Sequence, residues 1–130
     1  ILKAVYSGSG NDIFTLNNLS ENRTTSIYGG AGNDTFNINA ATFVTLYGGE
    51  GDDIFNINAV TSATLNGGDG DDTFVFADNA KLNGSIDGGS GDNTLDLAAY
   101  CQAADDPVNS GKATRNSGLL AGEAVFIYCR

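Results

Sequence analysis

Apolar and polar residues alternate in short runs along the first 97 residues of the chain. In each run two apolar residues flank one residue that is expected to face outward, as a β-strand requires. The expected inward pairs are Phe14 and Leu16, Phe36 and Ile38, Phe55 and Ile57, Phe74 and Phe76, and Leu95 and Leu97. A second set of short strands is expected to place one apolar residue each inward: Val5, Ile27, Leu46, Leu65 and Ile86.

A Gly-rich octapeptide separates the two kinds of strand and recurs five times. The copies are SGSGNDIF from Ser7, GGAGNDTF from Gly29, GGEGDDIF from Gly48, GGDGDDTF from Gly67 and GGSGDNTL from Gly88. A period of about twenty residues fits two short strands and two turns, and no single coil of this size can bury its apolar face alone. The sequence therefore predicts an all-β fold: a right-handed parallel β-solenoid (β-roll) of about five coils over residues 1–97.

Composition narrows the choice of function. The net charge is −10, with 16 acidic and 6 basic residues, which disfavours nucleic acid and anionic membranes as partners. The chain has no His, so the usual zinc sites and His-dependent nucleophilic catalysis are excluded. No apolar run is long enough to insert into a membrane. Because nothing supplies a nucleophile with a base, we expect no enzyme.

Acidic residues recur at the sixth position of the octapeptide. Stacked coils would place these residues about 5 Å apart, where carboxylates repel one another unless a cation lies between them. Calcium accepts carboxylate and main-chain oxygens in flexible geometry, whereas magnesium demands a stricter octahedron and holds its waters. The predicted metal-ligating side chains are those of Asp12, Asp34, Asp53, Asp72 and Asn93.

The octapeptides, each extended by one residue, resemble the GGxGxDxUx nonapeptide of the RTX family of calcium-dependent β-rolls. GGAGNDTFN, GGEGDDIFN and GGDGDDTFV match it fully, SGSGNDIFT departs at its first glycine, and GGSGDNTLD has Asn in place of Asp. The resemblance implies that main-chain oxygens of the same turns complete the metal sites. The implied oxygens are those of Gly8, Gly10, Gly30, Gly32, Gly49, Gly51, Gly68, Gly70, Gly89 and Gly91.

Only every other turn carries this motif, so we expect one column of about four Ca²⁺ ions along a single edge. The last site should be the weakest, because Asn93 supplies no charge. Residues at the fifth position of the octapeptide are expected to point outward and to tune affinity through their charge. Self-repulsion in the acidic turns should couple folding to Ca²⁺ binding.

The repeat stops after Leu97, and residues 98–130 are expected to cap the open end of the solenoid. A disulfide between Cys101 and Cys129 would close a local loop and would imply an oxidising compartment; two reduced, buried thiols are the alternative. The final AVFIYC run predicts one more strand. The same segment could instead bind a partner or another chain through that strand.

Two outward columns suggest other functions. Ser26, Thr45, Thr64 and Ser85 form a hydroxyl ladder that could bind a surface, and regular Thr/Asn arrays occur in ice-binding solenoids. Tyr28 and Tyr47 lie at matching outward positions and could contact a glycan. Charged residues interrupt the array at the calcium turns, which disfavours ice binding. Solvent-exposed strand positions filled by β-formers explain the ladder equally.

These observations favour an extracellular calcium-binding module with a structural or adhesive role. Ice binding and carbohydrate binding are the alternatives, with a surface, a glycan or another protein as candidate partners. The family resemblance implies a secreted or cell-surface bacterial protein. The sequence opens at Ile1 without a charged-then-apolar leader, so we expect a mature or excised piece whose targeting signal lies elsewhere.

Overall fold

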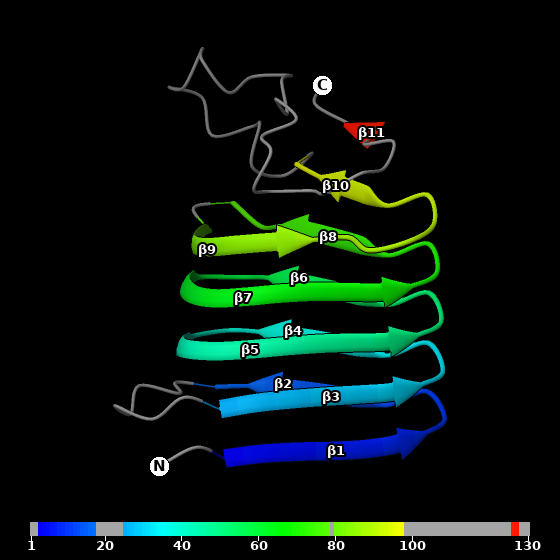
Figure 1. Ribbon diagram of the computed structural model, residues 1–130. Coiled ribbons are helices and arrows are strands. Elements are labelled where there is room, and N and C mark those ends of the chain that lie inside the picture. The colour runs from blue at the N-terminus through cyan, green and yellow to red at the C-terminus, as the bar shows by residue number, and fades with distance from the viewer. Residues whose placement is uncertain (1–2, 18–24, 79, 98–125, 128–130) are drawn as a thin grey trace.

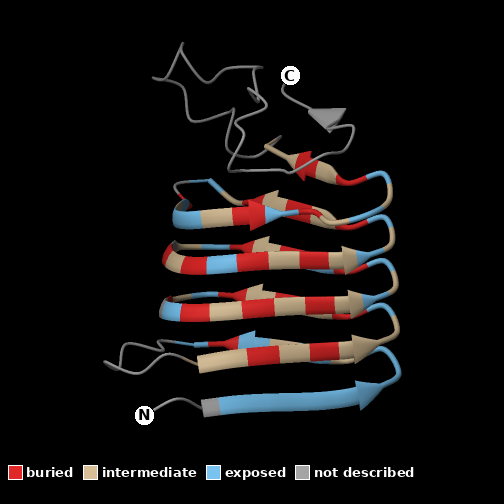
Figure 2. Cartoon of the chain, in the orientation of Figure 1, coloured by how far each residue is buried: buried red, intermediate tan, exposed pale blue. Residues whose placement is uncertain are grey.

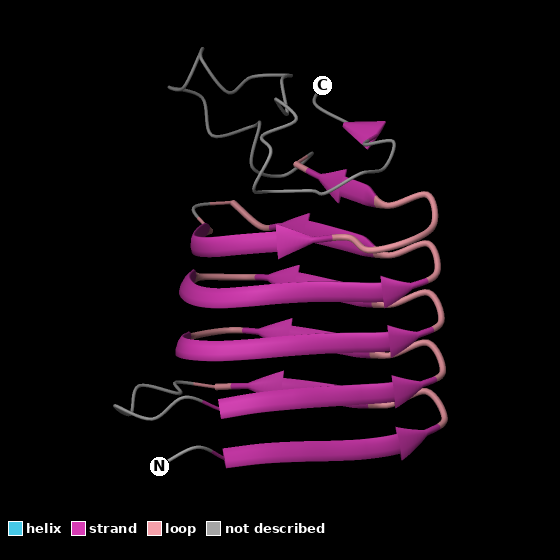
Figure 3. Cartoon of the chain, in the orientation of Figure 1, coloured by secondary structure: helices cyan, strands magenta, loops and turns pink. Residues whose placement is uncertain are grey.

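The chain winds into a parallel β-solenoid. The computed structural model describes residues 3–17, 25–78, 80–97 and 126–127, and the strands of this part form two parallel sheets (Figure 1, Figure 3). In order, one sheet contains β1 (Lys3–Ser9), β3 (Thr25–Ala31), β5 (Ala41–Glu50), β7 (Val60–Asp69) and β9 (Lys81–Asp87). The other contains β11 (Phe126–Ile127), β10 (Thr94–Asp96), β8 (Thr73–Phe76), β6 (Ile54–Ile57), β4 (Thr35–Ile38) and β2 (Ile13–Leu16).

The coil is right-handed, as predicted. In Figure 1 the strands of the β1 sheet run to the right in front, those of the β2 sheet return behind, and the chain rises with each circuit. This is the hand that nearly all parallel crossover connections take. About four full turns separate the first strand from the last, which agrees roughly with the predicted five coils. No helix of the described residues is long and apolar enough to cross a membrane.

Equivalent positions of successive repeats stack directly on one another. Phe36 pairs with Phe55 and Phe55 with Phe74 in the strand register, and their rings are stacked with centroids 4.7 and 4.8 Å apart. All three are fully buried. The alternation in the sequence thus becomes a column of rings, because the side-chain period of a strand sends every second residue into the core.

The opposite sheet contributes an aliphatic column to the same core. Its members are Ile27, Leu46, Leu65 and Ile86. Figure 2 shows the resulting alternation of buried and less buried residues along the inner coils. The predicted inward positions are therefore confirmed for the interior of the stack.

The first coil has no coil beneath it among the described residues, and several of its apolar and aromatic side chains are exposed. Val5 is 45% exposed, Tyr6 73% and Ile13 74%. At the other end β11 pairs in parallel with β10, Phe126 opposite Thr94 and Ile127 opposite Leu95. The predicted final strand is thus present and covers the last strand of one sheet.

The rest of the predicted cap is not part of the described structure. Cys101 and Cys129 both lie outside the described residues. The division at residue 97, the cap over residues 98–130 and its disulfide stay predictions.

Candidate metal centre

The five Gly-rich turns lie on one edge of the solenoid and connect the strands of the β1 sheet to those of the β2 sheet (Figure 1). Each turn passes close to the turn beneath it. Gly30 has φ = +104°, and a Cβ built on it would lie 2.0 Å from the main-chain oxygen of Gly8. Only glycine accepts both this backbone conformation and this approach at low cost. The glycines therefore allow coils to stack closely enough for side chains of one turn to reach the next.

The sixth-position residues form a continuous ladder along this edge. One side-chain oxygen of each accepts a hydrogen bond from the main-chain N–H of the sixth residue in the preceding turn. The bonds run from Asp12 N to Asp34 Oδ1 (2.8 Å), from Asp34 N to Asp53 Oδ1 (2.7 Å), from Asp53 N to Asp72 Oδ1 (2.8 Å) and from Asp72 N to Asn93 Oδ1 (2.9 Å). The structure thus brings all five predicted side chains together in one column.

Three carboxylates of this column have an oxygen without a partner. Asp34, Asp53 and Asp72 are 1%, 0% and 0% exposed, and the Oδ2 atom of each is buried without a hydrogen-bond donor. A buried, unpaired polar atom costs about 1–3 kcal/mol, and more when it is charged. Three such atoms in equivalent positions indicate a missing cationic partner rather than an accident of packing.

The first glycine of each turn packs directly against one of these oxygens. A Cβ built on Gly48 would lie 2.1 Å from Asp53 Oδ2 and 2.5 Å from the main-chain oxygen of Gly67 in the next turn. The same arrangement recurs at Gly29, with Asp34 Oδ2 and the Gly48 oxygen, and at Gly67, with Asp72 Oδ2 and the Gly88 oxygen. One carboxylate oxygen and one carbonyl oxygen from successive coils thus converge beside each of these glycines. Only glycine fits here, since a Cβ would clash with both oxygens.

Burial raises the pKa of these carboxyl groups. The pKa of Asp34 is raised, that of Asp53 is raised from 3.8 to about 6, and that of Asp72 to about 7. Desolvation is the main cause in each, the neighbouring carboxylates add to it, and the hydrogen bond from the preceding main-chain N–H opposes it. The charged form is therefore disfavoured until a cation compensates it.

The donor set fits a hard cation. In the described part of the chain, no three acidic side chains converge as one metal-binding group, so each site would rely on one carboxylate and on main-chain oxygens. Oxygen-only coordination with many carbonyls is what Ca²⁺ accepts and what softer metals do not favour. The residues present therefore fit calcium.

The main-chain oxygens that converge with the free carboxylate atoms beside the first glycines are those of the first glycine in the next turn. The sequence analysis selected the second and fourth glycines of each turn, and their oxygens lie against the next coil: Gly8 O faces Gly30 and Gly10 O faces Gly32. Their role as ligands stays a prediction. Reasoning from sequence missed the first-position carbonyls of Gly48, Gly67 and Gly88. The signal available in the sequence was the recurrence of glycine at the first position of four turns.

The two ends of the column differ from its interior. In the first turn the Ser7 hydroxyl donates a hydrogen bond to Asp12 Oδ2. In the last turn an amide nitrogen replaces the second oxygen, and Asn93 Nδ2 lies 3.5 Å from Gly89 O. Neither end has a buried, unpartnered carboxylate oxygen of the kind found at Asp34, Asp53 and Asp72.

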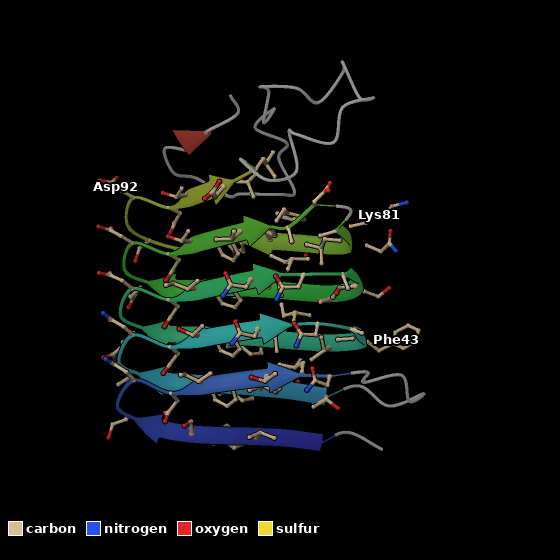
Figure 4. The ribbon with its side chains drawn as sticks, turned by 180° about the vertical axis from the view of Figure 1, so that it is seen from behind. Phe43, Lys81 and Asp92 are labelled. Atoms are coloured by element: carbon tan, nitrogen blue, oxygen red, sulfur yellow. The ribbon has the colours of Figure 1, made fainter. Side chains whose placement is uncertain are left out.

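The fifth-position residues form a second ladder that runs the other way. Asn11, Asn33, Asp52 and Asp71 each use Oδ1 to accept the main-chain N–H of the fifth residue in the following turn, at 2.8–2.9 Å. They are exposed, as is Asp92, whose side chain projects outward from the turn edge (Figure 4). These side chains thus hold neighbouring turns together from outside the column.

The outward columns of the β1 sheet are in register. Ser26 lies opposite Thr45, Thr45 opposite Thr64, and Thr64 opposite Ser85, so the hydroxyl ladder exists as a geometric feature. Beside it the rings of Tyr28 and Tyr47 are stacked at 4.6 Å. Tyr6 extends this stack at 4.6 Å. The sequence analysis missed Tyr6, although it precedes its Gly-rich turn just as Tyr28 does.

A shallow groove lies beside the hydroxyl ladder, toward the edge away from the Gly-rich turns. It is lined by Phe43, Val44, Thr45, Ser62, Ala63, Thr64, Asn83 and Gly84. Phe43 is 60% exposed, has φ = +57° and lies where the register between β5 and β7 shifts. It projects from the same edge as Lys81 (Figure 4). A bulky residue with positive φ is strained. No pattern in the sequence predicted this conformation.

Comparison with known proteins agrees with the geometry. A search of curated proteins and a search of solved structures gave no match. The family model for the RTX calcium-binding nonapeptide repeat matches four times, at residues 26–37, 43–57, 64–78 and 83–99. Each matched segment contains one of the later four turns, whereas the turn that begins at Ser7 precedes the first match. The chain therefore belongs to the family of RTX calcium-binding nonapeptide repeat proteins.

Proposed function

We propose that the chain is an extracellular structural module that binds Ca²⁺ between its coils and depends on it for stability. One observation carries this proposal: the buried, unpartnered Oδ2 atoms of Asp34, Asp53 and Asp72. Each lies beside a carbonyl oxygen of the next coil. Family membership supports calcium as the ion.

Binding would act on stability through charge. Without a cation, the folded chain must either keep buried carboxylates ionised in a column or take up protons at raised pKa values. An ion that binds only the folded state adds its binding free energy to folding. Each bound Ca²⁺ is therefore expected to raise the free energy of unfolding of the solenoid.

The proposed setting is a secreted or cell-surface bacterial protein, where calcium is plentiful. The regular core and the ion column would provide rigidity, and the chain has no histidine to serve as a general base. We therefore propose a structural or adhesive role rather than catalysis. The predicted Cys101–Cys129 bond is consistent with export.

A calcium titration tests this proposal. Calcium-free protein should gain far-UV strand signal and a higher Tm as Ca²⁺ is added, with saturation at a small whole number of ions per chain. Mg²⁺ at the same concentration should have a much weaker effect because it resists a cage of protein oxygens. Protein whose Tm and spectrum are unaffected by millimolar Ca²⁺ would contradict the proposal.

Saccharide binding is a second candidate, favoured by the groove beside Phe43. An exposed aromatic ring can stack on the apolar face of a sugar, while Thr45, Thr64 and Asn83 offer hydroxyl and amide groups to sugar hydroxyls. The acidic chain would select neutral rather than anionic glycans. Binding on a glycan array that is lost in Phe43→Ala and kept in Tyr6→Ala would support this function, and an array without any binding would contradict it.

Ice binding has less support from the structure. The hydroxyl ladder is regular, but the tyrosine stack lies beside it on the same sheet. A flat face is therefore lacking across these two columns. Thermal hysteresis in the presence of Ca²⁺ would revive this alternative.

A further inference from the structure

We propose that the column holds three ions rather than four, because an uncharged side chain of this particular chain closes the first of its four intervals. Ser7 closes the first interval between turns, and Asn93 ends the column at the last turn. This inference rests on the proposed calcium function and adds its stoichiometry and its boundaries.

The three later intervals are equivalent. In each, the first glycine of the turn packs against a buried, unpartnered Oδ2 atom, and the first carbonyl of the next turn converges on the same point. A Cβ placed there would approach Oδ2 to 2.2, 2.1 and 2.1 Å at Gly29, Gly48 and Gly67. These distances mean that no side chain fits beside the carboxylate oxygen. Each interval thus presents two converging acceptors that a small cation can join.

The first interval has the same backbone but a different side chain. Tyr6 pairs with Tyr28 and Gly8 with Gly30 in the register of β1 and β3, so Ser7 occupies the position that Gly29 has one coil later. It carries a Cβ where the four later turns have glycine. Its hydroxyl donates to Asp12 Oδ2, the atom equivalent to the unpartnered oxygens. The serine hydroxyl therefore takes the place of an ion as the partner of this carboxylate oxygen.

The last turn is closed by an amide. Asn93 is fully buried, and its Oδ1 accepts the N–H of Asp72 as an aspartate would. Its other atom is Nδ2, a donor, which would lie 2.6 Å from a Cβ on Gly88. An N–H donor at this point repels a cation, and an uncharged amide needs no cation to compensate it. No further Gly-rich turn of this motif follows in the sequence. An aspartate here would therefore be a buried charge without a carbonyl oxygen from a following turn to complete a metal site.

Counting bound ions in a pair of Ser7 variants tests the inference. Native mass spectrometry and calorimetric titration of the full chain should give three Ca²⁺ per wild-type molecule. Ser7→Gly should bind four, because it removes both the Cβ and the hydroxyl that donates to Asp12 Oδ2. Ser7→Ala is the matched control: it removes the hydroxyl but keeps the Cβ, so it should still bind three. Circular dichroism with Ca²⁺ confirms that each variant is folded.

The possible outcomes are distinguishable. Wild-type protein that binds no calcium contradicts the proposed function itself. Four ions in the wild type and three in Ser7→Ala would mean that the hydroxyl is a ligand, and three ions in Ser7→Gly would mean that Ser7 closes nothing; either result overturns the inference while the calcium function stands. Asn93→Asp should still bind three ions and should be less stable than wild type at pH 8. A fourth ion in Asn93→Asp would overturn the closure at the last turn.

Discussion

The two oxygens of a sixth-position aspartate have different tasks. In Asp53, Oδ1 accepts the N–H of Asp34 and so connects two coils. Its Oδ2 has no partner within the described chain and packs against Gly48. One side chain therefore holds the turn in place and also presents a ligand. An amide can perform the first task but not the second.

This division predicts the effect of Asp53→Asn. The amide oxygen keeps the bond to Asp34 N, so the turn should remain intact, but one ion should be lost from the count. Without calcium the variant should be more stable than wild type, because a buried carboxylate has been removed; we expect a rise in Tm of about 4 °C or more. Native mass spectrometry and thermal unfolding in calcium-free buffer measure both effects.

Asp52→Asn is the matched control for this change. It removes an equal charge from the adjacent, exposed position and keeps the oxygen that accepts Asp71 N–H. It should leave the ion count unchanged. An equal loss of calcium from both variants would mean that overall charge, and not the buried oxygen, governs binding.

The raised pKa values predict opposite effects of pH with and without calcium. The pKa values of Asp53 and Asp72, about 6 and 7, exceed 3.8, so between about pH 4 and 7 the folded protein binds more protons than the unfolded chain. Without calcium, the free energy of unfolding should therefore fall as pH rises through this window. Calcium competes with these protons, so its affinity should rise by about tenfold per pH unit and level off above pH 7.

Thermal unfolding at pH 5 and pH 8 checks this prediction. In calcium-free buffer the Tm should be higher at pH 5, and the Tm gain from added Ca²⁺ should be larger at pH 8. The double variant Asp53→Asn, Asp72→Asn should lose most of the pH dependence. A calcium-free Tm that increases from pH 5 to pH 8 would show that these carboxyl groups do not control stability.

At the scale of the strands, identical residues stacked in register provide the core. The rings of Phe14, Phe36, Phe55 and Phe74 form one continuous stack through β2, β4, β6 and β8. Phe36 and Phe55 each lie between two other rings, so little space is available for relaxation when one of them is removed. The strands are short, and this column compensates for the few contacts that each can make alone.

Phe55→Ala should therefore be strongly destabilising. Truncation of a buried phenylalanine costs about 3–5 kcal/mol, and the central position leaves a cavity between two coils. Its neighbour Ile54 is 40% exposed, and Ile54→Ala should cost about 1 kcal/mol. Chemical unfolding in saturating Ca²⁺ compares the two, and similar losses would contradict the assignment of the phenylalanine column as the core.

The same periodicity explains which features could be predicted from sequence. Phe36, Ile38 and the sixth-position aspartates recur in fixed register, so strands, columns and the candidate metal edge follow from the repeat. Features that occur in a single coil are not predicted by the repeat. The closure of the first interval by Ser7 and the left-handed conformation of Phe43 each depend on contacts specific to one coil. Which main-chain oxygens converge with the carboxylates also does not follow from the repeat, because side-chain chemistry does not determine where each carbonyl of a turn points.

For the molecule as a whole, the charge is unevenly placed. The chain carries a net charge of −10, and the column of sixth-position side chains places three buried carboxylates on one edge beside the exposed Asp52, Asp71 and Asp92. Bound calcium would neutralise the buried column but leave the outer ladder to the solvent. Screening by salt should therefore matter most when calcium is absent.

This difference predicts how ionic strength acts on stability. Raising NaCl from about 10 mM to 0.15 M shortens the Debye length from about 30 to 8 Å, which weakens repulsion along the edge. The Tm of calcium-free protein should rise, whereas that of calcium-saturated protein should change little. KCl should act like NaCl, since the effect is screening and not site binding. A Tm of the calcium-saturated protein that rises equally would mean that the ions do not neutralise the column, and that its repulsion persists in the bound state.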